Sequence, residues 1–513
     1  MRFSLRWLIP ALLSSISLLH AQSPATPGNR ASIDSLFPQL EDYIRDGMQK
    51  TGVPGVAVAI VYQDKVVYMK GFGVREAGRP DLIDPDTVFQ LASLSKPIAS
   101  TVVASLVGDG EVSWDDKIAN LDPDFQLSDP NITAQVTIRD LLSHRTGLPG
   151  SSGDVLEDLD FSRPEILHQM RLLRFVGEFR KSYQYNNFAF TEGGIAPAKK
   201  VHETWENLAD ERLFKPLGMT SSSYRWSDYR NSPNKAAIHV FVNGKAVARY
   251  LRIPDAEAPA GSASSSVRDM AQWVRLQLAN GKWNDKQVIA ASALNETHQA
   301  QIKSGEDPTS KKLRYYGLGW GVSQDADGKA IFSHSGAFFL GAATTVRLSP
   351  SDQLGIVVLT NTVPIGLPEA IATQFFDLYH YGKPTQDWFG TAHQFFQKLM
   401  ESKRTSCTDY SSLTPPASPA AAKPLSAYAG TYSNDYYGQI EITNDYGSLW
   451  LRLPADGSLY TLTRWDGDTF IYRPYGESDK IARGVKFTLD DKPRMLIENL
   501  ALEGNGVFLR TVP

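Results

Sequence analysis

The chain has 513 residues, more than one ordinary hydrophobic core accommodates, so we expect two or more domains. Its hydrophobic content of 42% and charged content of 21% are typical of a soluble globular protein. The net charge of −4 gives no basic surface, so we expect no nucleic-acid partner. The single cysteine, Cys407, excludes an intrachain disulfide framework and a cysteine-rich metal site. The 9 histidines show no metal-ligand spacing, and we therefore expect no metal or other cofactor.

The N-terminus has the pattern of a signal peptide over residues 1–21. Arg2 and Arg6 precede an apolar run from Trp7 to Leu19, and cleavage fits after Ala21. The run is too short for a spanning helix, and no later segment reaches membrane length, so we expect no stable membrane span. An uncleaved anchor is the alternative. We expect a secreted or periplasmic protein.

The first elements after the leader form a helix and a hairpin. Residues Ile33 to Lys50 have helical periodicity, and Gly55 to Tyr62 and Val66 to Lys70 are β-rich runs. The turn between the two runs contains Gln63-Asp64-Lys65, which predicts a β-hairpin.

A serine and a lysine follow at a spacing that can place both side chains on one face of a helix. In Ser93-Leu-Ser-Lys96, the lysine lies three residues after the serine, ahead of the apolar run Ile98 to Leu106. We expect a helix from near Ser93, with both side chains on one face and the hydroxyl near a helix N-terminus that favours an oxyanion. The ammonium can lower the pKa of the serine or, when desolvated, take its proton. A second such quartet, Ser232 to Lys235, lies in a breaker-rich stretch with no helix behind it, so context must decide.

The middle of the chain is predicted to be largely helical. Thr137-Ile-Arg-Asp140 has the capping-box pattern, and His144 to Pro149 supplies turn residues that end that helix. Further helices are expected at Trp205 to Leu213 and Val267 to Leu278.

Strands return after the helical region. We predict them at Tyr316 to Val322, Phe332 to Ala337, Thr344 to Leu348 and Gly355 to Leu359. Strands at both ends with helices between them indicate one sheet closed by distant segments and flanked by a helical region.

The composition changes near residue 383. An amphipathic helix at Trp388 to Met400 precedes a Pro/Ala-rich linker, Ser411 to Pro424, and Tyr428 to Leu509 contains short alternating strands. We therefore divide the chain after its leader into an α/β domain (32–383), a helix with linker (384–424) and a β-domain (425–513).

Three motifs stand in the order typical of one family of serine hydrolases: Ser93-Leu-Ser-Lys96, Tyr185-Asn-Asn187 and His334-Ser-Gly336. They resemble those of the class C β-lactamase-related, or penicillin-recognising (CubicO-type), serine hydrolases over roughly residues 33 to 365. Flanking phrases resemble the same family: Leu141 to Pro149, Leu213 to Met219 and Gly317 to Gly321. The domain from Tyr428 onward resembles the lipocalin-like domain often appended to such hydrolases. Two of the motifs have second copies. Tyr432-Ser-Asn434 lies in the β-domain beyond the linker, and His380-Tyr-Gly382 follows a helical run rather than a strand.

The resemblance implies a role for each motif residue. Ser93 would be the nucleophile, and Lys96 would lower the phenol pKa of Tyr185 so that the phenolate accepts the serine proton. Tyr titrates near ~10 and Lys near ~10.4, so one pKa must move by roughly three units to operate at pH 7. Asn187 would hydrogen-bond Lys96 and the amide of the substrate.

His334 stands where β-lactamases of this family usually carry lysine. Gly336 would let the substrate approach the backbone, and the N–H groups of Ala337 and Ser93 would form the oxyanion hole. A mostly neutral histidine removes a fixed charge for a substrate carboxylate, which disfavours efficient β-lactam turnover. We predict a structural role for His144, which belongs to a flanking phrase.

We therefore predict a β-lactamase/transpeptidase-like α/β (α+β) fold, with an antiparallel sheet, flanking helices and an all-helical region, followed by a small all-β lipocalin-like barrel. The expected activity is hydrolysis of an amide or ester bond in a small molecule or peptide through a Ser93 acyl-enzyme. Two alternatives stay open: a non-catalytic or slowly deacylating penicillin- or peptidoglycan-binding protein, and a true β-lactamase. The sequence leaves open the substrate, the role of the β-domain and the formation of a homo-oligomer.

Overall fold

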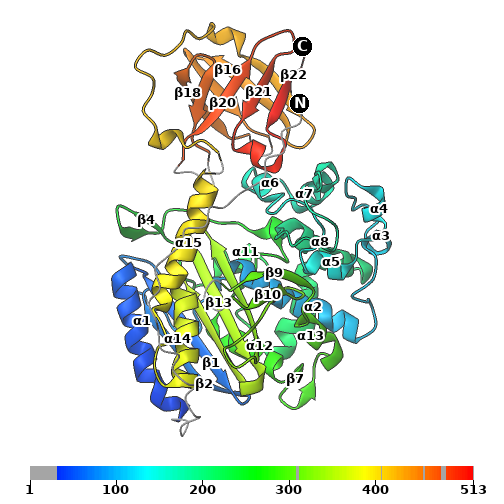
Figure 1. Ribbon diagram of the computed structural model, residues 1–513, viewed down its shortest axis with the longest axis vertical. Helices are drawn as coiled ribbons and strands as arrows, with labels where there is room; N and C mark the ends of the chain where they lie inside the picture. The colour runs from blue at the N-terminus through cyan, green and yellow to red at the C-terminus, as the bar shows by residue number, and fades with distance from the viewer. Residues whose placement is uncertain (1–31, 308–310, 406, 455–456, 475–480, 512–513) are drawn as a thin grey trace.

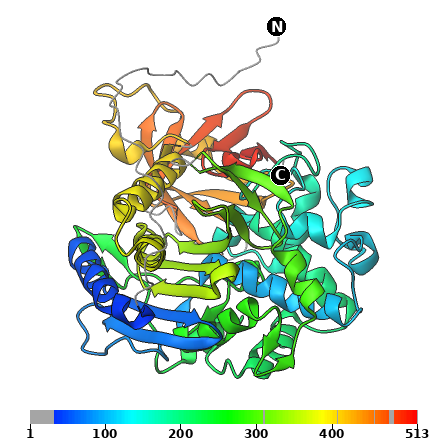
Figure 2. The ribbon, with the colours of Figure 1, turned by 60° about the horizontal axis from the view of Figure 1, so that its bottom comes forward.

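The computed structural model describes residues 32–307, 311–405, 407–454, 457–474 and 481–511. The predicted signal peptide, 1–21, lies outside the described residues. A large α/β body carries a small β-barrel at one end, as Figures 1 and 2 show. In the part of the chain that the structure describes, no helix is long and apolar enough to cross a membrane.

One antiparallel sheet of 8 strands forms the centre of the larger body. Its first strand pairs residue by residue with its last, so segments about 300 residues apart in sequence are neighbours, as predicted. The order is β2-β1-β14-β13-β12-β11-β10-β9. The bounds are β1 (Gly55–Tyr62), β2 (Lys65–Gly73), β9 (Ile302–Glu306), β10 (Leu313–Tyr316), β11 (Gly321–Gln324), β12 (Ala330–Phe338), β13 (Ala342–Ser349) and β14 (Leu354–Thr360).

Helices cover both faces of this sheet. The alternation of strand side chains sends Val56 and Val58 of β1 to one face, against α1 (Phe37–Thr51) and α14 (Leu367–Tyr381). The residues between them face α2 (Ser95–Gly108) and α12 (Val267–Leu278) on the other side. Helix α2 is buried over almost its whole length, which explains its continuous apolar run.

Short helices build the region between α2 and α12. As predicted, the capping box of Thr137 and Asp140 starts α5, with each side chain accepting from the backbone of the other. The helices that matter for the site are α5 (Ile138–Leu142), α6 (Asp154–Asp158), α7 (Arg163–Gln169), α8 (Asn187–Lys200) and α9 (Trp205–Ala209).

Two element predictions differ from the structure. The helix expected from Ser93 begins at Ser95, because Ala92 has a φ of 49° and residues Ala92–Leu94 form a 3₁₀ turn, η2. The single strand expected from Tyr316 to Val322 is a hairpin, β10–β11. Its turn is closed by the N–H of Gly317 donating to Trp320 O at 2.7 Å, and by the positive φ of Gly319.

The C-terminal strands close into a barrel of 8 strands, which confirms the predicted all-β barrel. Helix α15 (Trp388–Thr405) leads toward it, and α6 and α7 lie beneath it (Figure 1). Tyr428 and Phe470 pack edge to face in its core. The strands are β15 (Gly430–Asn434), β16 (Gly438–Asp445), β17 (Ser448–Arg452), β18 (Leu459–Asp466), β19 (Thr469–Tyr472), β20 (Arg483–Thr488), β21 (Arg494–Ile497) and β22 (Val507–Arg510).

Candidate active site

The first two motif residues, Ser93 and Lys96, are in direct contact. Ser93 lies half-buried in the η2 turn, and Lys96 lies fully buried in the first turn of α2. The Lys96 Nζ atom donates to Ser93 Oγ at 3.1 Å, to Asn187 Oδ1 at 2.7 Å and to Ala260 O at 3.1 Å. A lysine ammonium has three N–H donors, so these three contacts satisfy its charged form. One of them keeps Lys96 Nζ beside the Ser93 hydroxyl.

Burial shifts the pKa values of Lys96 and Tyr185 in opposite directions. It lowers the pKa of Lys96 to about 8, although Glu257, Asp154 and Glu157 act in the opposite direction. Burial also raises the pKa of Tyr185 well above its ordinary value, and a hydrogen bond with Ser93 offsets this only in part. Desolvation therefore disfavours the expected phenolate in the free protein, and the role of Tyr185 as proton acceptor stays a prediction. The lysine is the group that loses its proton more easily.

The aromatic face of Tyr185 covers the lysine. Its ring centroid lies 4.7 Å from Lys96 Nζ, and that of Phe190 lies 5.6 Å away. These contacts stabilise an ammonium that has left water.

Asn187 is held in one orientation by its neighbours. It is the first residue of α8, whose N-cap is Asn186, with a side chain that accepts from Ala189 N at 2.8 Å. The Nδ2 group of Asn187 donates to Asp154 Oδ1 at 3.1 Å. The amide oxygen of Asn187 therefore points to Lys96, as predicted, and Asp154 is a residue that the motifs did not indicate.

Gly336 brings the third motif against the η2 turn. Strand β12 pairs with β11 up to Ser333, and beyond that residue its edge lies against η2. A Cβ at Gly336 would lie 2.0 Å from Leu91 O and 2.9 Å from Leu94 N, so only glycine permits this approach. The backbone of Ala337, the next residue, is thereby placed beside the turn that carries Ser93.

His334 is neutral and fixed by two hydrogen bonds. Its Nδ1 lies 2.8 Å from Ser335 O, which can only accept, so Nδ1 carries the proton. Its Nε2 therefore accepts from the Tyr316 hydroxyl at 2.8 Å. Burial, and secondarily the charge of Lys96, lower the pKa of His334 to about 3. Tyr316 was missed as a site residue, although it directly precedes the flanking phrase Gly317 to Gly321.

His144 joins two loops, in line with its predicted structural role. It is fully buried, and its Nδ1 accepts from Asn186 N at 3.2 Å. Its ring packs against Tyr185 and Tyr316, with centroids 4.4 Å and 4.8 Å away. Burial holds its pKa well below the ordinary value, so it stays neutral beside Lys96.

A buried carboxylate cluster completes the surroundings of Lys96. The Arg252 guanidinium donates to Glu157 at 2.6 Å and to Glu257 at 2.9 Å, and lies 4.7 Å from the ring centroid of Phe338. No motif indicated these residues, because each is an ordinary charged residue until the fold brings it beside the lysine.

The second copies of the motifs lie away from the site. Lys235 of the other S-x-x-K quartet donates to Ser232 O at 3.1 Å. Tyr432 is buried in the barrel, and His380 contacts Asp352 at 2.9 Å. Sequence context thus selected the copy of each motif that the fold brings together.

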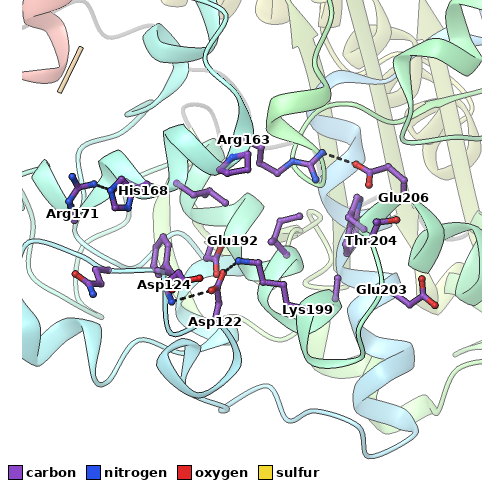
Figure 3. Close-up of a pocket in the computed structure, with 17 residues that line it drawn as sticks. Asp122, Asp124, Arg163, His168, Arg171, Glu192, Lys199, Glu203, Thr204 and Glu206 are labelled. Atoms are coloured by element: carbon purple, nitrogen blue, oxygen red, sulfur yellow. Dashed lines mark hydrogen bonds and ion pairs between the residues drawn. The ribbon is translucent and has the colours of Figure 1, made fainter. Parts of the chain in front are cut away.

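A cavity of about 800 Å³ lies elsewhere, along the far part of α8 (Figure 3). Buried Glu192 and the ion pair of Asp122 with Lys199 line it, whereas none of the predicted site residues does. Lys199 is 12 residues beyond Asn187 on α8, roughly 18 Å along a helix axis. The cavity is therefore separate from the Ser93 site.

Comparison with known proteins identifies the family. A family model described as Beta-lactamase matches residues 40–375, more than half of the chain. The chain belongs to the β-lactamase family. A second model, described as Domain of unknown function (DUF3471), matches residues 414–498, which include most of the barrel.

The similar proteins span bacteria, archaea and eukaryotes. Unguisins hydrolase ungD of Aspergillus violaceofuscus is 25% identical, with 82% of this chain and 77% of that protein covered. Protein flp of Staphylococcus aureus is 22% identical, with 63% and 62% covered.

Solved structures share the fold. The octameric penicillin-binding protein homologue from Pyrococcus abyssi has a TM-score of 0.60 at 20% identity, covering 92% of this chain and 100% of the other. The class C β-lactamase from Rhodobacter sphaeroides has a TM-score of 0.54 at 20% identity, covering 66% and 97%. At this identity the likeness establishes the β-lactamase/transpeptidase-like fold alone.

Proposed function

We propose that this member of the serine hydrolases of the β-lactamase fold cleaves an amide or ester bond through an acyl-enzyme on Ser93. The observation that carries the proposal is the 3.1 Å contact between Ser93 Oγ and the buried amine of Lys96. A pKa of about 8 leaves roughly one lysine in ten neutral at pH 7, which suffices for a base near its operating pH.

The proposed reaction has two halves. The neutral amine of Lys96 takes the hydroxyl proton of Ser93, directly or through the Tyr185 hydroxyl, as the serine oxygen bonds to the substrate carbonyl carbon. Collapse of the tetrahedral intermediate breaks the bond to the leaving amine or alcohol, which receives that proton. Water then attacks the ester on Ser93, releases the acid and restores the serine.

The remaining motif residues are proposed to bind the substrate. The N–H groups of Ser93 and Ala337 would donate to the oxyanion, an effect worth about 3–4 kcal/mol per donor in other hydrolases. Asn187 would hold the amide of the substrate in addition to Lys96. His334 is neutral and already engaged by Tyr316, so it offers no fixed charge to a substrate carboxylate.

That neutrality favours a peptidase, amidase or esterase over a true β-lactamase. The rate of the second half-reaction distinguishes a hydrolase from a slowly deacylating binding protein, since such a protein acylates and stays acylated.

Export of the protein is a further proposal, supported by the leader pattern of residues 1–21. A homo-oligomer is also proposed, because the homologue from Pyrococcus abyssi is described as octameric.

Intact-mass labelling with a fluorophosphonate tests the nucleophile. One adduct on the wild type and none on Ser93→Ala are expected. Absence of an adduct on both would contradict the mechanism. A panel of D-peptides, short esters and cephalosporins would then rank the substrates, and a persisting acyl adduct without turnover would favour the binding protein.

A further inference from the structure

The barrel reaches the catalytic domain through a buried carboxylate. Glu503 ends the short helix η9 (Leu500–Glu503) between β21 and β22 and is only 9% exposed. One of its carboxylate oxygens accepts from Gly153 N and Val155 N, each at 3.1 Å. The other accepts from the Tyr436 hydroxyl at 2.6 Å. Figure 1 shows η9, in red at the base of the barrel, beside α6.

The N-cap residue of α6 supplies no side-chain cap, and the carboxylate from the barrel takes that place. That N-cap is Gly153, with a φ of 93°, and a Cβ there would lie 2.5 Å from the ring of Phe188. Neighbouring helices α5 and α8 are capped locally, by the side chains of Thr137 and Asn186. Removal of the Glu503 carboxylate would leave the N–H groups of Gly153 and Val155 without this acceptor.

From α6, a path of hydrogen bonds leads to the nucleophile. Asp154 Oδ1 accepts from Asn187 Nδ2 at 3.1 Å, and Asn187 Oδ1 accepts from Lys96 Nζ at 2.7 Å. Lys96 Nζ in turn contacts Ser93 Oγ at 3.1 Å. The position of α6 therefore fixes the amide that orients the lysine.

We propose that Glu503 is a positioning residue for the Ser93 site: the carboxylate from the barrel holds α6 so that Asp154 orients Asn187, and Asn187 orients Lys96. The proposal rests on the proposed function, because it concerns the rate at which Ser93 is acylated. It also assigns the barrel a role, which is to complete the support of the catalytic site. A chain without this contact keeps its fold and nucleophile but reacts slowly.

Two variants of the full chain separate positioning from folding. Glu503→Ala removes the acceptor, and we expect the labelling rate and kcat for a short ester to fall about tenfold or more with a nearly unchanged KM, because an ångström-scale misplacement costs rate rather than binding. Glu503→Gln retains one carbonyl oxygen for the two N–H groups and should react within about threefold of the wild type. Circular dichroism and thermal unfolding check that both variants fold.

The pH profile of labelling supplies a readout that a purely structural role would not move. The titratable groups facing Lys96 are Asp154 and Glu157 on α6, and Glu257, Tyr185, His144 and His334 on other elements. Both carboxylates raise the pKa of Lys96, so their retreat in Glu503→Ala should move the midpoint of the profile to lower pH.

The matched control breaks another contact between the two domains. Gln169 on α7 donates to Asp435 O at 3.3 Å, and Gln169→Ala should keep the wild-type rate and midpoint. An equal loss in Gln169→Ala, or a wild-type rate in Glu503→Ala, would overturn the proposal. Should Glu503→Ala fail to fold, Glu503→Asp decides instead, because its carboxylate is one methylene shorter and is withdrawn from Gly153 N and Val155 N. A wild-type rate and midpoint in that variant would also overturn the proposal. Failure of the wild type to be labelled would refute the proposed function instead.

Discussion

Substitution of Gly336 by alanine tests the geometry of the site most directly. The added Cβ would lie 2.0 Å from Leu91 O, 2.4 Å from Thr344 Oγ1 and 2.9 Å from Leu94 N. Real Cβ atoms essentially never come closer than 3.0 Å to such atoms, so strand and turn must separate by about 1 Å. Two of the three obstacles are backbone atoms, which no side-chain rotation can remove.

The expected effect on reactivity is larger than the effect on stability. A displacement of about 1 Å between Ser93 and the proposed oxyanion donor Ala337 can cost about 100-fold in rate. Overpacking of this kind costs about 1–3 kcal/mol of unfolding free energy. We therefore expect Gly336→Ala to fold but to be labelled by the fluorophosphonate about 100-fold more slowly.

The assay compares labelling rates by intact mass, with urea unfolding measured in parallel. Ser335→Ala is the matched control, because it changes the preceding position of β12 and removes hydroxyl contacts with Thr345, at 3.1 Å, and with Glu369, which both lie outside the predicted site residues. It should change the labelling rate little. A Gly336→Ala protein labelled within about threefold of the wild type would refute the argued need for close approach.

Three further predictions concern charge and hydrogen bonding. The labelling rate should rise about tenfold per pH unit below pH 8 and level off above it, because Lys96, with a pKa of about 8, acts as a base only once it has lost its proton; a rate that stays flat between pH 6 and 9 would contradict this. Tyr316→Phe should lower the unfolding free energy by about 0.5–1.5 kcal/mol in urea titration, because it removes the part-buried hydrogen bond to Nε2 of His334. Unchanged stability would argue against that bond. Ser93→Ala should stay within about 1 kcal/mol of the wild type in the same titration, since the side chain is only half-buried; a larger loss would mark Ser93 as structural.

The fold was largely predictable because its signals are local. The apolar runs of β1 and α2 reflect burial of each element, and the turn at Gln63 and Asp64 reflects local backbone conformation. The two errors arose where the long-range fold overrides local pattern. The positive φ of Ala92 shifts the helix start, and the loop with Gly319 packs against Lys96 O.

The motif residues of the site were predictable, but their protonation was not. Their order along the chain selected Ser93, Lys96 and Asn187 from chance copies, and the fold places these three in contact. The charge state of Tyr185 depends on how deeply the phenol is buried, and spacing in the sequence carries no information about burial depth. Desolvation raises its pKa and so disfavours the expected phenolate in the free protein.

Three of the residues that escaped prediction, Glu257, Asp154 and Glu157, act on Lys96 through their charge rather than through a motif. Burial alone lowers the pKa of Lys96, and Glu257, Asp154 and Glu157 raise it, so that the balance falls near 8. A base is most effective when its pKa lies near the working pH, so these carboxylates tune the amine that the motif supplies. Two of them lie on α6, and N–H groups at the start of that helix donate to Glu503 of the barrel. The motif therefore supplies the reactive groups, whereas their protonation depends on contacts that extend into the second domain.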